Sequence, residues 1–279
     1  MKGYVDQTTA GAVRADDGTR LAYREKGTGE PILFVPGLGY ASWSWEPQLE
    51  QLGDRARVIA MDNRGTGTSD APPGPYTIET MAEDALAVSR VVPGPVHVVG
   101  ASMGGYIALT LALRHPNVVT SLTLISTTSG GPGCTPVPDA TLEAWATSDR
   151  VSPQEYARAT MPLSFAPGWT TRHPAEFERL LRMRLEHPTS SRAWAAQFAA
   201  AAAYLEAGAP EGEVDVPVLI VHGTEDRVVP YANMAHLARR LPSATRLTLP
   251  GAGHLCWIEE ADRVNQAIEA HVLSSSAKD

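Results

Sequence analysis

The chain has 279 residues and a mass of 29.8 kDa, enough for one large α/β domain or two smaller ones. Its formal net charge is -8, and no cluster of lysines or arginines offsets it, which disfavours nucleic acid or an anionic membrane as a partner. The two cysteines, Cys134 and Cys256, have no metal-type spacing and indicate no disulfide framework. Because no secretory leader or long apolar run is evident, we expect a cytoplasmic protein without a membrane segment.

The first half of the chain alternates strand-like and helix-like patterns. A hairpin is expected over 12–14 and 20–25, around an Asp-Gly turn at residues 17–18. Buried strands are then predicted at 32–35, 58–61, 96–99 and 121–125, and helices at 45–52, 78–90 and 104–115. This order predicts a mostly parallel sheet with helices on both faces.

The alternation stops near Thr127 and resumes after residue 214. The intervening segment opens with a Gly/Pro-rich linker and shows no strand pattern, only helical pieces at 142–146, 153–159, 174–186 and 191–207. We therefore predict an α/β core over 1–128 and 215–279 and a helical cap, or lid, over 129–214, at the sheet edge where open α/β sheets bind ligands. A second helical domain with its own core is the alternative. The remaining predictions are strands at 217–221 and 245–249 and helices at 231–241 and 259–273.

A candidate nucleophile stands between the strand 96–99 and the apolar helix that follows it. The residues Gly100-Ala101-Ser102-Met103-Gly104 form a Gly-x-Ser-x-Gly sequence at this strand-to-helix turn. A sharp turn of this kind exposes the serine so that a base and a substrate can both reach it. The alternative is a serine in an ordinary glycine-rich turn.

A serine nucleophile needs a base, and the chain has eight histidines. His254 lies in a glycine-rich loop directly after the predicted strand 245–249, at the same sheet edge as Ser102, and is our candidate. The others lie within or at the end of a predicted strand or helix, or directly precede a proline: His97, His115, His173, His187, His222, His236 and His271.

The base in turn needs a carboxylate that orients the imidazole. Asp226 is the leading candidate because it follows the predicted strand 217–221 at that same edge, with the adjacent Glu225 as its rival. The alternative is that one of these two acids only forms a loop salt bridge with Arg227. The order Ser102, Asp226, His254 is typical of α/β hydrolases.

The remaining site predictions concern the oxyanion hole and the pocket. The backbone N–H of Met103 and that of Leu38, in the loop after the strand 32–35, are the expected oxyanion donors. The expected pocket residues carry few charges, which favours a neutral, partly apolar ester or lactone as the small-molecule substrate. They flank the catalytic positions or lie in the cap: Gly37, Tyr40, Trp145, Met161, Trp169, Trp194, Phe198, Leu255 and Trp257. For the five in the cap, the alternative is that they form the packed core of the cap itself.

Over nearly its whole length the chain resembles the α/β-hydrolase superfamily, closest to bacterial esterases, enol-lactone hydrolases and haloperoxidase-like serine hydrolases with a helical cap. The resemblance implies hydrolysis of a carboxylic ester or lactone, with no cofactor and no metal. It rests on five ordered matches: Pro36-Gly37-Leu38-Gly39, Asp62-Asn63-Arg64-Gly65-Thr66-Gly67-Thr68-Ser69, the Ser102 pentapeptide, Gly223-Thr224-Glu225-Asp226 and Gly253-His254.

The chain departs from the family in one place. Pro36-Gly37 stands where many relatives have His-Gly, which bears on loop geometry more than on catalysis. By resemblance, residues 62–69 form a structural turn outside the site. A serine at position 102, where dehalogenases and epoxide hydrolases have a carboxylate, argues against those activities.

Other functions compete with ester hydrolysis. The Gly-Leu-Gly sequence at 37–39 and Asp62 are similar to parts of a dinucleotide-binding unit, but Ser42 stands at the third glycine position and the catalytic candidates would go unexplained. Perhydrolysis, hydrolysis of a carbon–carbon bond, cyclisation and a non-catalytic receptor role would all use the same motifs. The oligomeric state is not predicted.

Overall fold

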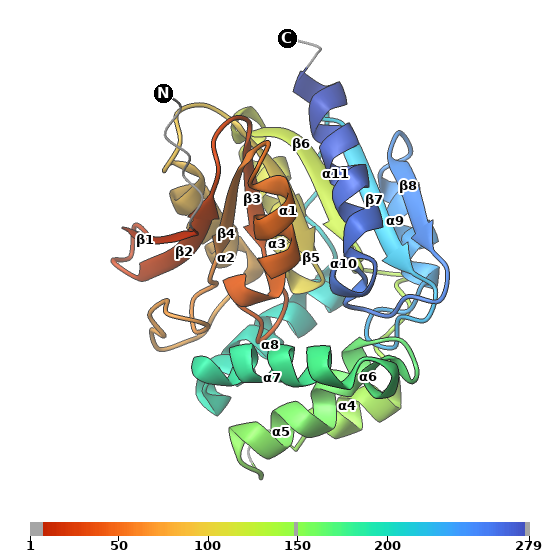
Figure 1. Ribbon diagram of the computed structural model, residues 1–279. Helices are drawn as coiled ribbons and strands as arrows, with labels where there is room; N and C mark the ends of the chain where they lie inside the picture. Colours follow the sequence, from red (N-terminus) through yellow and green to blue (C-terminus); the bar gives the residue numbers. More distant parts are fainter. Residues whose placement is uncertain (1–7, 148–149, 277–279) are drawn as a thin grey trace.

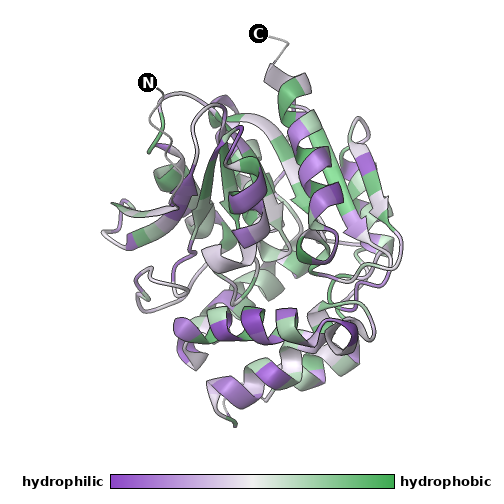
Figure 2. Cartoon of the chain, viewed as in Figure 1, coloured by the Kyte–Doolittle hydropathy of each residue, from purple (hydrophilic) through white to green (hydrophobic). Residues whose placement is uncertain are grey.

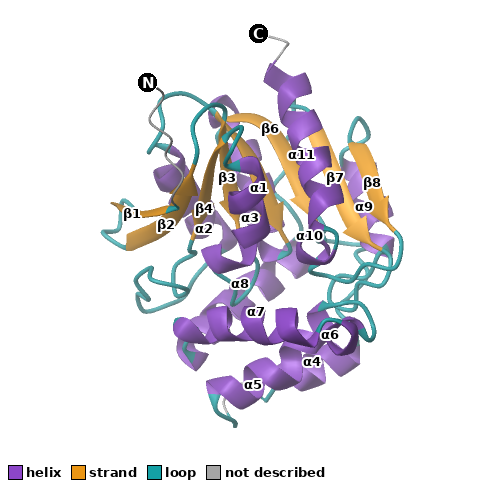
Figure 3. Ribbon diagram, in the orientation of Figure 1, coloured by secondary structure: helices purple, strands orange, loops and turns teal. Residues whose placement is uncertain are grey.

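The computed structural model describes residues 8–147 and 150–276. Its described strands form one sheet, which Figure 3 shows in orange at the centre of the molecule. In chain order the strands are β1 (Thr9–Arg14), β2 (Arg20–Lys26), β3 (Pro31–Val35), β4 (Arg57–Met61), β5 (Val96–Ala101), β6 (Val119–Ile125), β7 (Val218–Gly223) and β8 (Thr245–Leu249).

The order of the strands across the sheet is β1-β2-β4-β3-β5-β6-β7-β8. Strand β2 is antiparallel to both of its neighbours, β1 and β4, and the other neighbouring pairs are parallel. The carboxyl ends of β3, β5, β7 and β8 therefore open at one edge, and the loops after these strands carry the predicted site residues. The mostly parallel sheet predicted from the sequence is confirmed.

Helices cover both faces of this sheet, in two hydrophobic clusters. Side chains alternate between the clusters along a buried strand: on β3, Leu33 and Val35 belong to one and Ile32 and Phe34 to the other. The core helices are α1 (Glu46–Leu52), α2 (Ile78–Ser89), α3 (Met103–Arg114), α9 (Ala232–Arg240), α10 (Cys256–Glu259) and α11 (Ala261–Ser276). Residues of α2, α3 and α9 line the first cluster, and residues of α1, α10 and α11 the second.

Between β6 and β7 the chain forms a group of helices beyond the carboxyl ends of the strands (Figure 1). We call residues 129–214 the cap. Hydrophilic stretches run along its helix α7 (Pro174–Glu186) in Figure 2. Its helices are α4 (Asp139–Trp145), α5 (Pro153–Thr160), α6 (Trp169–Arg172), α7 (Pro174–Glu186) and α8 (Ser191–Ala207).

The starts of two cap helices follow from local sequence. Helix α5 opens with a capping box, in which the Ser152 hydroxyl accepts the Glu155 N–H and the Glu155 carboxylate accepts the Ser152 N–H. Helix α8 is capped by Ser190, whose hydroxyl accepts the N–H of Ala193. The two serine caps thus mark where α5 and α8 begin.

The final helix predicted over 259–273 is present as α11, and the short helix α10 directly before it was not predicted. The chain turns at Glu260, whose backbone (φ -124, ψ 42) is not helical. Packing explains the break: in α10 the Trp257 ring stacks on Trp45 at 5.0 Å and its indole N–H donates to Ser44 O. The short helix α6 was also not predicted. No helix in the described part of the chain is long and apolar enough to cross a membrane.

Candidate functional site

Ser102 lies at the turn between β5 and α3 in a backbone conformation that non-glycine residues rarely adopt (φ 54, ψ -123). Two hydrogen bonds from β6 and the loop after it hold this geometry. The Ser102 N–H donates to Ile125 O at 2.9 Å, and the Thr127 hydroxyl donates to Ser102 O at 2.7 Å. The strain is thus maintained by neighbours on the sheet, as in the serine turn of α/β hydrolases.

Gly104 lets the helix after the serine approach the sheet. A Cβ on Gly104 would collide with the carbonyl oxygen of Val35, at the end of β3. Only glycine therefore lets α3 begin this close to the loop that follows β3. That loop contains Leu38, so the same contact brings the serine turn and the expected oxyanion donor together.

Asp226 and His254, in the loops after β7 and β8, are hydrogen-bonded to each other. His254 Nδ1 lies 2.9 Å from Asp226 Oδ2, and both side chains are buried. The other carboxylate oxygen, Oδ1, accepts the N–H groups of Val228 and Val229, each at 2.8 Å. The carboxylate is therefore fixed on both oxygens, with one of them directed at the imidazole.

The hydrogen bonds among the described residues do not include one between Ser102 Oγ and His254. Contacts of this kind are often long without substrate and tighten when substrate binds. Ser102, Asp226 and His254 nevertheless follow parallel strands at one sheet edge, where the sequence placed them.

His222, at the end of β7, is a third partner of Asp226 that sequence reasoning missed. Its Nε2 lies 3.2 Å from Asp226 Oδ2 and 2.9 Å from Val229 O. Since both partners are acceptors, Nε2 carries the proton in the neutral ring. Burial acts to raise the pKa of Asp226, but the charges and hydrogen bonds of His254 and His222 outweigh it and lower that pKa to about 2. The carboxyl group is thus ionised at neutral pH.

The two neighbours of Asp226 have other roles. Glu225 is exposed, and Arg227 directs its guanidinium to the cap, where Nη2 donates to Pro162 O at 2.8 Å and to Phe165 O at 3.0 Å. The alternative of a loop salt bridge to Arg227 is not found among the ion pairs of the described residues. Arg227 instead fastens the Asp226 loop to the cap.

Residues 37–40 form the turn expected to supply an oxyanion donor, and we call them the oxyanion turn. The Tyr40 N–H donates to Gly37 O at 3.2 Å, and Gly39 has a positive φ of 69, which this kind of turn requires at its third position. No acceptor in the described part of the chain is bonded to the Leu38 N–H. Asn63 holds the turn from the core, its Nδ2 donating to Pro36 O at 2.9 Å.

The 62–69 segment supports this turn from behind. The buried Asp62 carboxylate accepts the N–H of Ser42 at 2.8 Å and that of Thr68 at 2.9 Å. One oxygen thus anchors the chain just after the oxyanion turn and the other closes the segment on itself. The motif is structural in this geometry.

A cavity of about 360 Å³ opens onto Ser102 between the core and the cap. Among the described residues that line it, none is charged. Nor do the described residues contain a group of three His, Cys, Asp or Glu side chains placed to hold a metal. The lining includes Leu38, Met103, Tyr106, Cys134, Val228 and Val229 from outside the cap helices, and Leu142, Trp145, Phe198, Ala201, Ala202 and Leu205 from α4 and α8.

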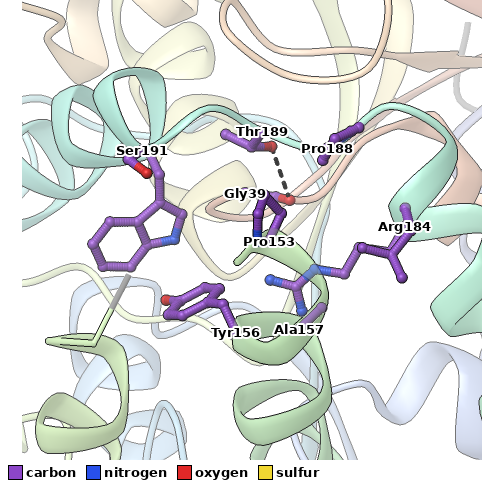
Figure 4. A pocket seen from close by; sticks show the side chains of 10 residues that line it. Gly39, Pro153, Tyr156, Ala157, Arg184, Pro188, Thr189 and Ser191 are labelled. Atoms are coloured by element: carbon purple, nitrogen blue, oxygen red, sulfur yellow. Dashed lines mark hydrogen bonds between the residues drawn. The ribbon is translucent and has the colours of Figure 1, made fainter. Parts of the chain in front are cut away.

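The predicted pocket residues divide between this cavity and the surrounding core. Trp145 and Phe198 line the cavity, whereas Trp194 stacks on Phe198 at 5.1 Å and lines a second hollow of about 40 Å³ between the cap and Gly39. Figure 4 shows this second hollow, with Tyr156 and Arg184 among its labelled side chains. Gly37 packs against Ser102, because a Cβ there would lie 3.1 Å from the serine Cβ. The others are buried in the second core cluster: Tyr40, Met161, Trp169, Leu255 and Trp257.

Tyr106, one helical turn after Ser102 on α3, was not predicted to line the cavity. Its ring stacks on that of Tyr204 from α8 at 4.6 Å, and burial raises the pKa of its hydroxyl. Its position in the first turn of α3, four residues after Ser102, was a usable signal. Cys134, in the Gly/Pro-rich linker, carried no such signal.

Glu259, on α10, connects the His254 loop to the cap. Its carboxylate accepts the Gly253 N–H at 3.0 Å and the Ala166 N–H at 3.2 Å. Burial raises its pKa to about 7, against the opposing effect of these two hydrogen bonds. A second link is the Leu255 N–H, which donates to Ser164 O at 2.8 Å. The base loop is therefore also tied to the cap.

The comparisons with known proteins agree with this fold. Residues 30–261 match the family model described as alpha/beta hydrolase fold. The chain is 31% identical over 245 residues to a putative carbamate hydrolase, RutD, of Agrobacterium fabrum, covering 87% of this chain and 92% of that protein. It is 30% identical to a non-heme chloroperoxidase of Streptomyces lividans, covering 95% of this chain and 100% of that protein.

Solved structures give the same result. The enol-lactonase from Burkholderia xenovorans superposes with a TM-score of 0.81 at 26% identity, covering 94% of this chain and 100% of that one. The esterase RhEst1 from a Rhodococcus species superposes with a TM-score of 0.82 at 26% identity, covering 95% and 98%. The resemblance stated from the sequence is confirmed: the chain belongs to the α/β-hydrolase superfamily.

Proposed function

We propose that this protein is a serine hydrolase that cleaves a neutral carboxylic ester or lactone through an acyl-enzyme. The observation that carries the proposal is the 2.9 Å contact between His254 Nδ1 and Asp226 Oδ2, at the sheet edge where the strained Ser102 stands. A base with an oriented imidazole and a serine on a sharp turn are the parts that acyl transfer needs.

In this mechanism His254 Nε2 takes the Ser102 proton as Oγ attacks the ester carbonyl carbon. The oxyanion that forms accepts the N–H groups of Met103 and Leu38. The tetrahedral intermediate then breaks its bond to the alcohol oxygen, which takes the proton from His254. Water, deprotonated by His254, hydrolyses the acyl-enzyme and restores Ser102.

The electrostatics of the buried pair favour this chemistry. Because the pKa of Asp226 is held at about 2, its carboxylate is charged throughout the neutral range and stabilises the imidazolium as His254 gains its proton. The contact between Asp226 Oδ2 and His254 Nδ1 also fixes the tautomer of His254, leaving Nε2 of the imidazole free to accept the serine proton.

The cavity supports an apolar substrate. Its described lining has no charged side chain that would recognise a carboxylate or an ammonium group, and its volume of about 360 Å³ is at the lower end of small-molecule sites. The apolar lining favours a short to medium acyl group over the small polar acyl group of a simple carbamate. We further propose that the cap, residues 129–214, shapes this specificity through α4 and α8.

A panel of p-nitrophenyl esters from acetate to octanoate, with γ-lactones and a phenyl carbamate, tests the proposal. Wild-type protein should hydrolyse the esters, with butyrate or hexanoate preferred, and should react with a fluorophosphonate probe. Ser102→Ala should lose both activities, whereas Ser274→Ala, at an exposed position on α11, should retain them. Ester turnover that survives in Ser102→Ala would contradict the proposal, and preferential hydrolysis of the carbamate would replace its substrate class.

A further inference from the structure

A single cap side chain, Gln197 on α8, bonds two loops of the core. Its Oε1 accepts the Gly39 N–H at 2.9 Å, and its Nε2 donates to Arg64 O at 2.8 Å. Gln197 is 0% exposed. Because one partner is a donor and the other an acceptor, only one orientation of the amide satisfies both.

Gly39 is in contact with the cap on more than one side. A Cβ at Gly39 would lie 3.0 Å from Cδ1 of Trp194, one helical turn before Gln197. Figure 4 shows Thr189 beside Gly39, where the threonine hydroxyl donates to Gly39 O at 3.4 Å. The N–H, the carbonyl and the α-carbon of Gly39 thus all contact the segment 189–197.

This arrangement matters for the residue before Gly39. Leu38 is flanked by two peptide groups, and the Gly39 N–H belongs to the one on its carboxyl side. Asn63 holds the other end of the loop through Pro36 O at 2.9 Å. With both ends fixed, the direction of the intervening Leu38 N–H is set, and that N–H has no partner among the described residues.

A buried amide is costly unless both of its ends are bonded. An apolar side chain of the same length would fill this position and would need no hydrogen-bond partner. That side chain would, however, leave the Gly39 N–H and the Arg64 carbonyl unpaired at the interface between cap and core. The two hydrogen bonds of Gln197 therefore contribute more to the geometry of the oxyanion turn than to the packing of α8.

We propose that Gln197 is a positioning residue that holds the oxyanion turn, residues 37–40, in its catalytic geometry from the cap. The proposal rests on the function proposed above, because the Leu38 N–H matters only if an oxyanion forms. It follows that the oxyanion hole is complete only while α8 is docked on the core, and that disturbing the cap there slows chemistry more than it weakens substrate binding.

The test compares Gln197→Met, which keeps the side-chain length and removes both bonds, with Gln48→Met. Gln48 is an equally buried glutamine on α1 whose Nε2 donates to Trp257 O and Asn265 Oδ1, both at 2.9 Å, without a bond to the oxyanion turn. We expect Gln197→Met to lower kcat by about 10- to 100-fold with KM within about threefold, less than the loss of a whole oxyanion donor. Gln48→Met should lower the melting temperature similarly and leave kcat within about twofold.

Two further measurements separate positioning from general stability. A trifluoromethyl ketone, whose serine adduct carries an oxyanion, should bind Gln197→Met more weakly by the same factor as the loss in kcat/KM. Gln197→Glu keeps an acceptor for the Gly39 N–H and loses the donor to Arg64 O, so it should recover part of the lost kcat. If Gln197→Met does not fold, Gln197→Glu replaces it in the test. The expected falls in kcat and in ketone affinity are then smaller than those expected for Gln197→Met.

The outcome that overturns the proposal is a Gln197 variant that loses thermal stability like Gln48→Met but keeps wild-type kcat and ketone affinity. Failure of the proposed function would look different, because wild-type protein would then neither hydrolyse esters nor bind the ketone. In that case amide hydrogen exchange still tests the contact itself. Residues 37–40 should exchange faster in the Gln197 variant than in Gln48→Met, and equal exchange would refute the link.

Discussion

The Asp226–His254 pair and the oxyanion turn are built in different ways, although they serve the same reaction in our proposal. Asp226 is bonded by the N–H groups of Val228 and Val229 and by His222 and His254, all of which belong to the core. The oxyanion turn is held by Asn63 from the core and by Gln197 from the cap. The hydrogen-bond partners of the acid therefore all belong to the core, whereas the oxyanion turn is held from both the core and the cap.

This difference has a consequence for how mutations act. Changes in the cap should leave the pKa of Asp226 and the His254 tautomer intact while they alter the oxyanion turn. Changes in the loops after β7 and β8 should alter the pKa of Asp226 and the His254 tautomer while they leave the oxyanion turn intact. Three variants test that division. The loss of kcat expected for Gln197→Met lies between the losses expected for Asp226→Asn and Asn63→Ala.

The largest effect is expected from Asp226→Asn, which removes the charge and the tautomer control at His254 while keeping the side-chain shape. We expect kcat to fall by as much as about 10⁴. Measurement of kcat across pH 6–9 for p-nitrophenyl butyrate checks this. Glu225→Gln, at the exposed neighbouring position, is the matched control and should stay near wild type. The reverse result would move the orienting role to Glu225.

A smaller effect is expected from Asn63→Ala, which removes the hydrogen bond to Pro36 O that holds the oxyanion turn from the core. The loss of one such bond, about 1.4 kcal/mol, corresponds to roughly a tenfold fall in kcat. The double variant with Gln197→Met should lose less than the product of the two single losses, because both act on one turn. Independent, multiplicative losses would show that the two side chains do not share a target.

The smallest effect concerns the tie between the His254 loop and the cap. The pKa of Glu259 is raised from its ordinary 4.5 to about 7, so the folded state retains a proton that the unfolded state releases. Stability contributed by this carboxyl group is therefore present below pH 4.5 and falls as the pH rises to 7. Melting temperatures between pH 4.5 and 7.5 should decline less steeply for Glu259→Gln than for wild type.

The neighbouring Glu260→Gln variant is the control for this slope. The Glu260 side chain is paired with Arg263 at 3.6 Å and has no hydrogen bond or ion pair to the His254 loop or the cap within the described part of the chain. The Glu260 charge is the smallest of the causes that raise the pKa of Glu259, so the pH slope of this variant should stay close to that of wild type. Parallel slopes for all three proteins would show that Glu259 does not titrate in this range and that its carboxylate plays no part in the pH response.

Much of the fold was predictable because buried parallel strands and the turns after them have strong local patterns. The apolar run 96–99, the Gly-x-Ser-x-Gly turn and the glycine loop before His254 each indicated their element, and the order of the strands then placed Ser102 and His254 at one edge. These local patterns were sufficient to predict the fold class, which the structure and the comparisons confirm.

The parts that sequence did not reveal depend on contacts between distant segments. Gln197 lies in a helix rich in alanine, where no polar stripe marks which face meets the core, and its partner Gly39 is 158 positions away. Trp257 was expected at the pocket because it follows His254 closely, yet it stacks on Trp45 in the core. Nearness along the chain fixes neither the direction of a side chain nor its partner in another element.

The most direct test of the central claim is to trap the acyl-enzyme. Protein mixed with excess p-nitrophenyl butyrate and quenched in acid within the first turnover should carry the mass of one butyryl group, and peptide mapping should place it on Ser102. Ser102→Ala should carry none. A butyryl group on another residue, or ester turnover with no adduct in protein that forms a fluorophosphonate adduct at Ser102, would contradict the account.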